Sequence, residues 1–217
     1  DAARSLGIKV ARTTGSNALP VAEFTIGLMI ATLRFQALGH ERLRQGRWMA
    51  FNELPGPALC ISGSTVGIVG FGAIGQTVAR LVKGFGCRVL YNKRCRLPAE
   101  VEQALGVAFA EMPELLANAD IVSLNCPLTP ETTDLINTES IARMKSTAVL
   151  VNVARGGVVN EDDLALALRN RTIRGAAMDV YSIEPLPSDS ALLGLDNIVL
   201  TPHLAAATAD TFEPTVR

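Results

Sequence analysis

The sequence predicts an α/β protein built on a doubly wound parallel sheet. Short apolar segments alternate with helical patterns along most of the chain. The apolar segments lack polar alternation, which is typical of parallel strands covered by helices on both faces of a sheet. In addition, a glycine-rich turn joins one apolar strand directly to a helix, as in sheets that bind ligands at the carboxyl ends of their strands.

The expected elements follow one another in regular order from residue 65. Runs rich in β-branched and other apolar residues predict strands at 65–69, 87–91, 107–109, 120–124, 148–151, 175–180 and 198–200. Apolar residues at helical spacing predict helices at 74–85, 99–105, 112–118, 138–144 and 161–170. Gly86 is expected to end the first of these helices.

The two ends of the sequence are expected to belong to a second folding unit of a longer protein. The chain begins with Asp1 rather than Met, and a helix tail leads to a lone strand at 7–11, which cannot form a sheet by itself. A helical pattern at 205–217 stops in mid-course. Between them, the segment 21–38 predicts one buried helix that is apolar all round. We expect an absent lobe, a partner subunit or both to cover it.

Composition excludes several classes of partner. Of the 217 residues, 48% are hydrophobic and 19% are charged, and the formal net charge is −1. This balance provides enough apolar surface for a core and predicts no nucleic-acid partner. The uncharged stretch at 24–33 is shorter than the ~20 residues of a membrane-spanning helix, so we expect no membrane partner.

The four cysteines indicate a reducing compartment and no metal site. Cys60, Cys87, Cys95 and Cys126 form no Cys-x-x-Cys or Cys/His pair. Buried reduced thiols are the ordinary outcome for cysteines in apolar runs. Because no signal peptide opens the sequence, we expect a cytoplasmic protein.

The glycine turn predicts a dinucleotide site. Residues 70–75 read Gly-Phe-Gly-Ala-Ile-Gly and lie between a predicted strand and a predicted helix. Gly70 allows the tight turn, Gly72 lets the backbone approach a pyrophosphate, and Gly75 lets the helix pack on the strand. Since strand, turn and helix occur in the required order, an ordinary glycine turn is the weaker interpretation.

The end of the second predicted strand favours NADP over NAD. An acidic residue there usually accepts hydrogen bonds from the adenosine ribose and repels a 2′-phosphate. This sequence instead has Asn92, Lys93 and Arg94. Two cations without a carboxylate favour a phosphorylated ribose, and the alternative is a solvated basic loop.

Several motifs together resemble those of the D-isomer-specific 2-hydroxyacid dehydrogenases. Besides the glycine turn they are residues 18–23, 126–132 (Cys-Pro-Leu-Thr-Pro-Glu-Thr), 152–157 (Asn-Val-Ala-Arg-Gly-Gly), 177–180 (Ala-Met-Asp-Val), 184–185 (Glu-Pro) and 201–203 (Thr-Pro-His). These motifs occur in the family's order across nearly the whole chain.

The resemblance implies a division of the chain. A Rossmann cofactor domain is expected at 59–204, and an interdomain helix and linker at 21–58. Pieces of a flavodoxin-like substrate domain are expected at 1–20 and 205–217. The family's substrate domain usually gives backbone amides to the substrate carboxylate. Those donors would lie outside this sequence, which could leave the fragment by itself inactive.

Three residues are expected to carry out 2-keto acid reduction. The reaction needs a cation that holds the carboxylate and polarises the ketone, a hydride donor, and an acid that protonates the oxygen. Arg155 supplies a planar fork, His203 is the expected general acid and base, and Glu184 would bond the other ring nitrogen of His203. The alternatives are a cap or surface arginine, a core histidine and a solvated carboxylate. His40 is expected to be structural or exposed.

The resemblance also implies further cofactor contacts. The amides of Ala73 and Ile74 would meet the pyrophosphate. The remaining contacts would come from Cys126, Pro127, Thr132, Val153, Ala154, Asp179, Ala205 and Ala206. Thr132 would offer its hydroxyl, and Asp179 would orient the nicotinamide carboxamide. The alternative for Asp179 is a strand-end carboxylate that bonds a backbone amide. Trp48 is expected to pack within the interdomain segment.

The expected function is NAD(P)-dependent hydride transfer between a small D-2-hydroxy acid and its 2-keto acid, glyoxylate/hydroxypyruvate-like or phosphoglycerate-like. The family implies a homodimer through the apolar helix. The alternative is a dinucleotide-sensing, corepressor-like protein, against which the retained proton donor argues. Another type of reductase is disfavoured because neither Tyr91 nor Tyr181 has Lys four residues later.

Overall fold

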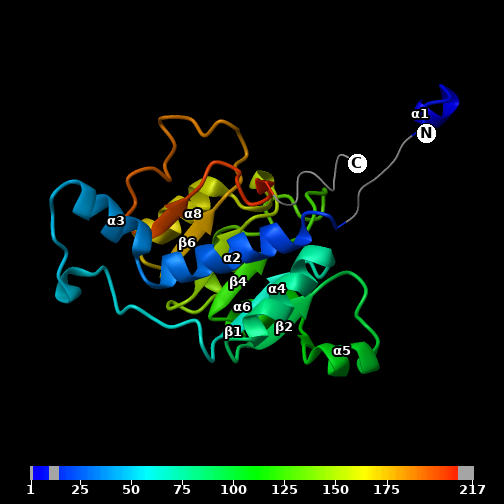
Figure 1. The fold of residues 1–217 in the computed structure, drawn as a ribbon, viewed down its shortest axis with the longest axis horizontal. Coiled ribbons are helices and arrows are strands. Elements are labelled where there is room, and N and C mark those ends of the chain that lie inside the picture. The colour runs from blue at the N-terminus through cyan, green and yellow to red at the C-terminus, as the bar shows by residue number, and fades with distance from the viewer. Residues whose placement is uncertain (1, 10–14, 210–217) are drawn as a thin grey trace.

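The computed structural model describes residues 2–9 and 15–209 and confirms the predicted parallel sheet (Figure 1). Its seven strands are β1 (Thr65–Val69), β2 (Arg88–Asn92), β3 (Ala108–Phe109), β4 (Ile121–Leu124), β5 (Val149–Asn152), β6 (Gly175–Met178) and β7 (Ile198–Leu200). They lie in the order β3-β2-β1-β4-β5-β6-β7, and every neighbouring pair is parallel.

The strand order reverses between β1 and β4. From β1 the chain builds outward through β2 and β3, and then returns to place β4 on the other side of β1. Val69 pairs with Asn92 of β2 and with Leu124 of β4, so these three strands end at one level. A crevice forms at such a switch point because the connections leave in opposite directions, and α/β proteins bind ligands there.

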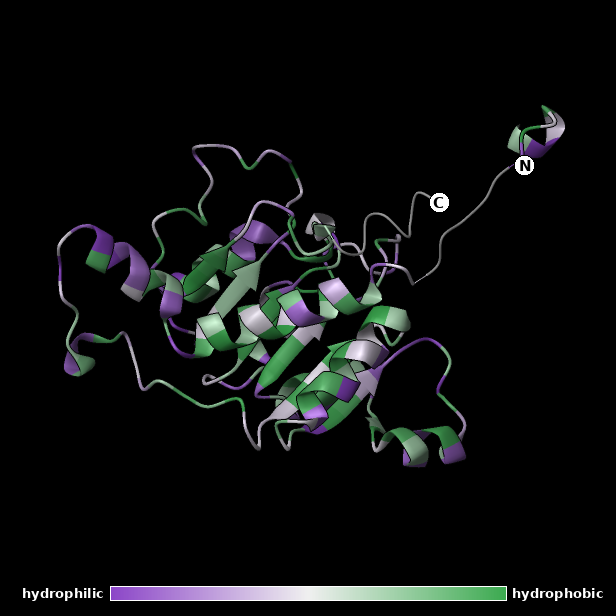
Figure 2. Cartoon of the chain, viewed as in Figure 1, coloured by the Kyte–Doolittle hydropathy of each residue, from purple (hydrophilic) through white to green (hydrophobic). Residues whose placement is uncertain are grey.

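Helices cover both faces of the sheet, as predicted. On one face, α2 (Ala18–Leu33) and α4 (Ala73–Lys83) form one apolar cluster with the strands. The helices α6 (Met112–Asn118), α7 (Thr138–Ala142) and α8 (Glu161–Arg169) form the other. The remaining helices are α1 (Ala2–Ser5), α3 (Gln36–Arg44) and α5 (Ala99–Leu105), with short 3-10 turns at Phe51–Glu53 and Gly156–Val158. Hydrophobic residues fill the strands, whereas α3 is largely hydrophilic (Figure 2).

The single helix expected at 21–38 is wrong. Helix α2 begins at Ala18 and ends at Leu33, and α3 follows after a bend of 68°. At the bend Phe35 adopts a left-handed backbone with φ 55°, and its ring is buried beneath the guanidinium of Arg174, 4.9 Å from the ring centre. This contact stabilises a conformation that a bulky residue otherwise avoids.

The chain itself covers much of α2. Helix α2 packs against α4 and against β5, β6 and β7, which accounts for its buried residues without an absent lobe or a partner. Its outer side still exposes Leu19 and Gly27. No single helix in the described ranges is long and apolar enough to cross a membrane, and only α2 and α3 taken together across their bend meet that test.

The structure also bears on the predictions for the two ends of the chain and for the linker. Gly7 lies in a turn after α1, and Ile8 and Lys9 have no regular structure, so the predicted strand is absent from 7–9, while 10–11 lie outside the described residues. Residues 205–208 are not helical, and most of the helix predicted at 205–217 lies outside the described residues. Trp48 is 82% exposed, so its predicted packing is wrong.

Candidate active site

The glycine turn follows β1 at the switch point of the sheet. A Cβ on Gly70 would lie 2.4 Å from the backbone nitrogen of Cys126, and one on Gly75 would lie 2.3 Å from the carbonyl oxygen of Gly70. Gly70 also has a φ of +90°, which favours glycine. A Cβ on Gly72 would meet nothing within 4 Å. Two glycines therefore allow close packing, and the third faces open space.

That open space fits the pyrophosphate of a dinucleotide. Gly72 is the N-cap of α4, an 11-residue helix. The first amides of a helix have no intrahelical acceptor, and the positive end of the helix dipole attracts anions. Ala73 is exposed and Ile74 is partly exposed at this terminus. Both features fit the predicted contacts of these two amides with an anionic group.

One cavity brings together several predicted site residues. Its volume is about 510 Å³, and it is lined by Ile74, Asn125, Cys126, Pro127, Leu128, Val153, Ala154 and Arg155. It extends from the N-terminus of α4 past the carboxyl ends of β4 and β5. Such a volume is within the usual range for small-molecule sites. Five predicted cofactor residues and Arg155 thus share one cavity.

The basic segment after β2 lies at the other side of the glycine turn. Asn92 donates a side-chain hydrogen bond to the carbonyl of Ala110 at 2.9 Å, and its own carbonyl accepts from Gly70 N–H at 2.9 Å. Lys93 is partly exposed and Arg94 is exposed. Neither cation forms an ion pair within the described residues. Both are therefore free of direct ion pairs there, and Arg94 lies near the Glu131 carboxylate, whose pKa is lowered first by a hydrogen bond from Thr129 and also by the charge of Arg94.

The loop after β4 uses its own hydroxyl groups. Thr132 Oγ1 accepts from Thr129 N–H at 2.7 Å and lies 2.6 Å from the Pro127 carbonyl, to which it donates. The hydroxyl proton of Thr132 is thus already engaged, and Thr129 Oγ1 lies 3.2 Å from the same oxygen, so this hydroxyl has little capacity left for a ligand. Burial raises the pKa of the Cys126 thiol, which keeps this lining residue neutral.

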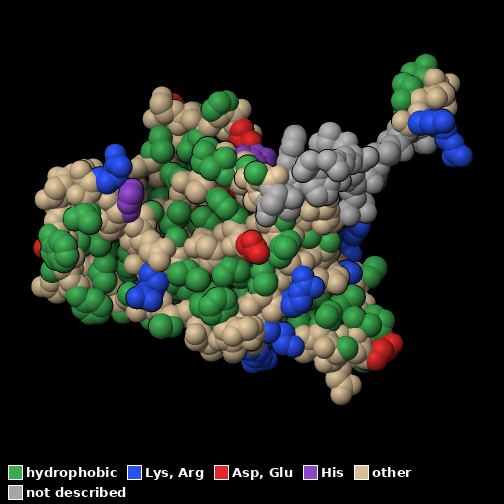
Figure 3. All heavy atoms as spheres, in the orientation of Figure 1, with side chains coloured by type: hydrophobic (Ala, Val, Ile, Leu, Met, Phe, Trp, Pro, Cys, Tyr) green, Lys and Arg blue, Asp and Glu red, His purple; other side chains and the backbone are tan. Residues whose placement is uncertain are grey.

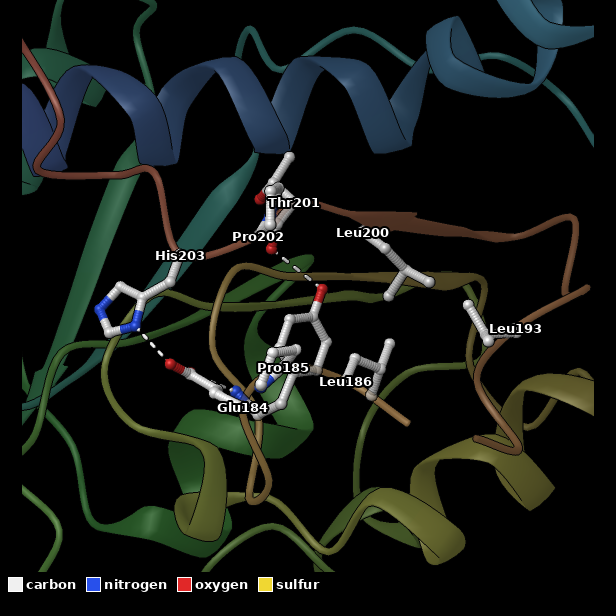
Figure 4. Close-up of a pocket in the computed structure, with 9 residues that line it drawn as sticks. Glu184, Pro185, Leu186, Leu193, Leu200, Thr201, Pro202 and His203 are labelled. Carbon is white, nitrogen blue, oxygen red and sulfur yellow. Dashed lines mark hydrogen bonds and ion pairs between the residues drawn. The ribbon is translucent and has the colours of Figure 1, made fainter. Parts of the chain in front are cut away.

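His203 and Glu184 form a direct pair. His203 Nδ1 lies 2.8 Å from Glu184 Oε2 (Figure 4). The pKa of Glu184 is lowered by this bond first, then by the Tyr181 N–H that donates to Oε1 at 3.0 Å, and also by the charge of Arg155. Because a carboxylate only accepts hydrogen bonds, Nδ1 carries the proton. The other ring nitrogen, Nε2, is left for a substrate.

Asp179 holds the loop that carries His203. The Asp179 side chain is fully buried and accepts from the Thr201 hydroxyl at 2.6 Å and from the backbone N–H groups of Leu204 and Ala205, each at 2.9 Å. Its carbonyl accepts from His203 N–H at 2.8 Å. His203 is thereby held at a φ of 55°, which a residue with a side chain rarely adopts.

These bonds match the alternative interpretation of Asp179 as a strand-end carboxylate bonded to backbone amides. β6 ends at Met178, so Asp179 is the first residue beyond the strand. Three of its carboxylate lone pairs are occupied by the 201–205 loop. Only the carboxylate lone pair that is still unoccupied could accept a hydrogen bond from the nicotinamide carboxamide. Ala205 is buried in this loop, and Ala206 is exposed.

Arg155 lies on a second, tightly packed loop. Asn152 is buried, accepts from Ala154 N–H at 3.0 Å and donates to the Arg155 carbonyl at 3.0 Å. A Cβ on Gly156 would lie 1.9 Å from the carbonyl carbon of Tyr181. The loop of Arg155 therefore rests directly on the chain that leads to Glu184. Arg155 is exposed and its Nη1 donates to the Ala154 carbonyl at 2.6 Å, which leaves the other donors of the guanidinium for a ligand.

Sequence reasoning missed three residues that shape this site. Asn152 and Thr201 are polar residues at strand ends beside predicted site residues, and that position was the available signal. Tyr181 gave no comparable signal. Its hydroxyl lies 3.0 Å from the carbonyls of Met178 and Thr201, and burial raises its pKa to about 12. Tyr181 thus ties the end of β6 to the loop of His203.

A second cavity lies beside the His203–Glu184 pair. Its volume is about 420 Å³, and Figure 4 shows Pro185, Leu186, Leu193 and Leu200 around it. Its lining is mostly apolar. No group of three or more His, Cys, Asp or Glu side chains that could hold a metal ion occurs within 2–9 and 15–209. His40 is exposed on α3, far along the chain from this site.

This chain is similar to known proteins. The family described as "D-isomer specific 2-hydroxyacid dehydrogenase, NAD binding domain" matches residues 26–205. A glyoxylate reductase of Korarchaeum cryptofilum is 42% identical over 206 residues, which are 94% of this chain and 62% of the relative. A hydroxypyruvate reductase of Thermotoga maritima is 40% identical over 211 residues, 96% of this chain and 66% of the relative.

Solved structures show the same fold. A glyoxylate reductase from Paecilomyes thermophila has a TM-score of 0.88 at 33% identity, covering 100% of this chain and 64% of that one. An NADPH-dependent glyoxylate/hydroxypyruvate reductase from Sinorhizobium meliloti, in complex with NADP and malonate, has a TM-score of 0.84 at 34% identity, covering 97% and 64%. The chain spans about three fifths of the length of the first curated relative.

Proposed function

Because this chain belongs to the D-isomer-specific 2-hydroxyacid dehydrogenase family, whose NAD-binding domain it contains, we propose that the full-length protein reduces a small 2-keto acid to its D-2-hydroxy acid. The observation that carries the proposal is the His203–Glu184 pair. It leaves the second ring nitrogen of His203 able to carry a proton to a substrate at the carboxyl edge of the sheet. A purely dinucleotide-sensing protein would have no use for a proton donor oriented in this way.

Arg155, His203 and Glu184 have separate roles in the proposed reaction. When bound, the nicotinamide supplies the hydride for reduction and accepts it in the reverse direction. The Arg155 fork binds the carboxylate of the keto acid and polarises the ketone. Protonated His203 donates from Nε2 to the ketone oxygen and keeps its Nδ1 proton, which Glu184 accepts in a hydrogen bond. In the oxidation direction, neutral His203 takes the hydroxyl proton back.

The substrate class rests on the relatives. Glyoxylate and hydroxypyruvate are the substrates in the names of several proteins about 40% identical to this chain, and D-3-phosphoglycerate is in another at 39%. We propose a glyoxylate- or hydroxypyruvate-like substrate. The test is the oxidation of NADPH and NADH by the full-length protein with each of these acids. Cofactor binding without turnover of any 2-keto acid would favour the sensing alternative.

We also propose how the chain divides into domains, from its family, and where the protein is located. Residues 59–204 would be the cofactor domain and 21–58 the interdomain segment. Residues 1–20 and 205–217 would be pieces of the substrate domain. The described structure contains four free thiols, which supports the proposed cytoplasmic location.

The proposed cofactor preference is for NADP, because Lys93 and Arg94 have no ion-pair partner in the described structure. Arg94→Ala is expected to raise the Kd for NADPH about tenfold or more, the size of a lost charge-assisted bond to phosphate, with little change for NADH. Titration calorimetry measures both. Arg80→Ala, at the far end of α4, is the control. Equal losses for both cofactors would refute the preference.

We also propose a homodimer. One exposed leucine remains on α2, two exposed aromatic residues lie on the segment after α3, and hydrophobic groups gather on this part of the surface (Figure 3). Leu19 is 48% exposed, Trp48 82% and Phe51 80%. Burial in a second copy would remove this apolar surface from water. Light scattering on the full-length protein is expected to give twice the mass of one chain. A monomer at micromolar concentration would contradict the proposal.

A further inference from the structure

Glu102 is a buried carboxylate on a short helix whose other residues are mostly exposed. It lies on α5, and the residue is only 7% exposed. Its Oε1 accepts from the Tyr91 hydroxyl at 2.6 Å and from Arg96 Nε at 2.8 Å, and its Oε2 accepts from Arg96 Nη2 at 2.8 Å. The Tyr91 oxygen in turn accepts from Leu97 N–H at 2.8 Å. Both carboxylate oxygens thus hold the 93–97 loop.

The same network reaches the glycine turn. The ring of Tyr91 packs on Phe71, the residue between Gly70 and Gly72, with the ring centres 4.4 Å apart. Tyr91 also meets the edge of Phe109 at 5.6 Å, and Arg96 lies over Phe109 at 5.5 Å from the ring centre. The turn that faces the pyrophosphate and the basic loop after β2 are therefore supported by one buried cluster.

Among the three cations of the 93–97 loop, Glu102 forms an ion pair only with Arg96. Arg96 is held in a two-point ion pair with Glu102, which planar guanidinium and carboxylate groups favour. The bonds from Arg96 and then from Tyr91 lower the pKa of Glu102 to about 2, so the carboxylate stays ionised at neutral pH. Lys93 and Arg94, one and two residues beyond the end of β2, form no such ion pair in the described part of the chain.

We propose that Glu102 is a positioning residue for cofactor selection, which holds the 93–97 loop so that Lys93 and Arg94 face the 2′-phosphate of NADP. The proposal rests on the NADP preference proposed above. We call the contacts of Glu102 with Arg96 and Tyr91 the brace. Arg96 is a third cation of the loop, but it belongs to this brace and does not act as a phosphate ligand. NADH has no 2′-phosphate, so its binding does not depend on the orientation of these cations.

The physical reason is preorganisation. Long side chains on a free loop lose conformational entropy when a ligand orders them, and a loop already held by buried contacts loses less. If the brace were lost, NADPH would have to order the loop when it binds, and the entropy lost would weaken its binding. Release of Arg96 would also supply another cation near the site, which would strengthen NADPH binding if Arg96 could bind phosphate directly. The two roles therefore predict changes of opposite sign.

The test is Glu102→Gln in the full-length protein, with calorimetric titration by NADPH and NADH. We expect the Kd for NADPH to rise about tenfold, the size expected when the ligand must order two long side chains, and the Kd for NADH to change less than about twofold. Glu100→Gln is the matched control, because it removes the same charge from an exposed position on the same helix. It should change neither Kd.

Tyr91→Phe is the second variant, in case Glu102→Gln does not fold. It keeps the ring contacts and removes only the hydroxyl that links Glu102 to Leu97 N–H. We expect a smaller loss, about threefold, that is again selective for NADPH. Tighter NADPH binding in Glu102→Gln, or equal losses for both cofactors in both variants, would overturn the proposal.

The Arg94→Ala titration separates the two proposals. If Arg94→Ala loses NADPH selectively while Glu102→Gln and Tyr91→Phe do not, the cofactor preference stands and the brace is refuted. If Arg94→Ala weakens both cofactors equally, the 2′-phosphate site itself is refuted, and the role of Glu102 with it. Selective losses in all three variants support both.

Discussion

Replacement of His203 by alanine is expected to lower kcat for 2-keto acid reduction by ~10² or more, the usual contribution of a general acid. The ring nitrogen Nε2 is the outer end of a pair whose other end is fixed by Glu184 at 2.8 Å. Alanine leaves water as the proton donor. Steady-state kinetics of NADPH oxidation with glyoxylate or hydroxypyruvate measure the effect, and the Kd for NADPH should change little because His203 does not line the 510 Å³ cavity.

His40→Ala provides the matched control for that experiment. His40 is the other histidine of the chain and is exposed on α3. Its replacement removes the same ring from a position remote in the fold from the proposed site, so kcat should not change. An undiminished kcat in His203→Ala, or an equal loss in His40→Ala, would contradict the role assigned to His203.

Arg155→Lys is expected to lower kcat/KM for the 2-keto acid by ~10² or more, although it preserves the positive charge. A planar guanidinium can bind both carboxylate oxygens and polarise the ketone, whereas an ammonium group is a point charge on a flexible stem. Kinetics over a range of keto acid concentrations should show both a higher KM and a lower kcat. Because Arg155 lines the 510 Å³ cavity but the substitution keeps the positive charge there, the Kd for NADPH should change much less than kcat/KM.

Arg88→Lys is the corresponding control. Arg88 is exposed at the first residue of β2, at the opposite edge of the sheet from the carboxyl ends. The same chemical change there should leave kcat/KM unaltered. An Arg155→Lys variant as active as the wild type would show that the planar fork is not required and that Arg155 contributes charge alone.

Local patterns predicted most of the sheet. β1, β7, α5 and α6 begin and end at the predicted residues, because an apolar run bounded by polar or turn residues carries its own limits. The glycine turn was also predictable, because the Gly-x-Gly-x-x-Gly spacing between a strand and a helix is itself local, although the backbone that leaves no room for a Cβ on Gly70 belongs to the distant Cys126. Such features depend on residues that are adjacent in the chain or on sterics within one turn.

Long-range contacts explain the failures. The bend between α2 and α3 depends on Phe35 packing beneath Arg174, which is 4.9 Å from the ring centre but distant in sequence. The hydrogen bonds of Asp179 depend in the same way on the loop at 201–205, and its predicted contact with the nicotinamide carboxamide stays a prediction. Neither partner could be identified from the periodicity of one segment.

The sequence by itself predicted the parallel α/β architecture and the glycine turn, because each depends on local pattern, and its resemblance to a family indicated the groups proposed to bind a carboxylate and to transfer a proton. Only the tertiary structure decided how those groups are held. The left-handed backbone of His203, the direct bond to Glu184 and the packing of Gly156 against Tyr181 arise from separate loops that meet at one edge of the sheet. Hydrogen bonds and close packing between distant segments, which no single segment encodes, set that geometry.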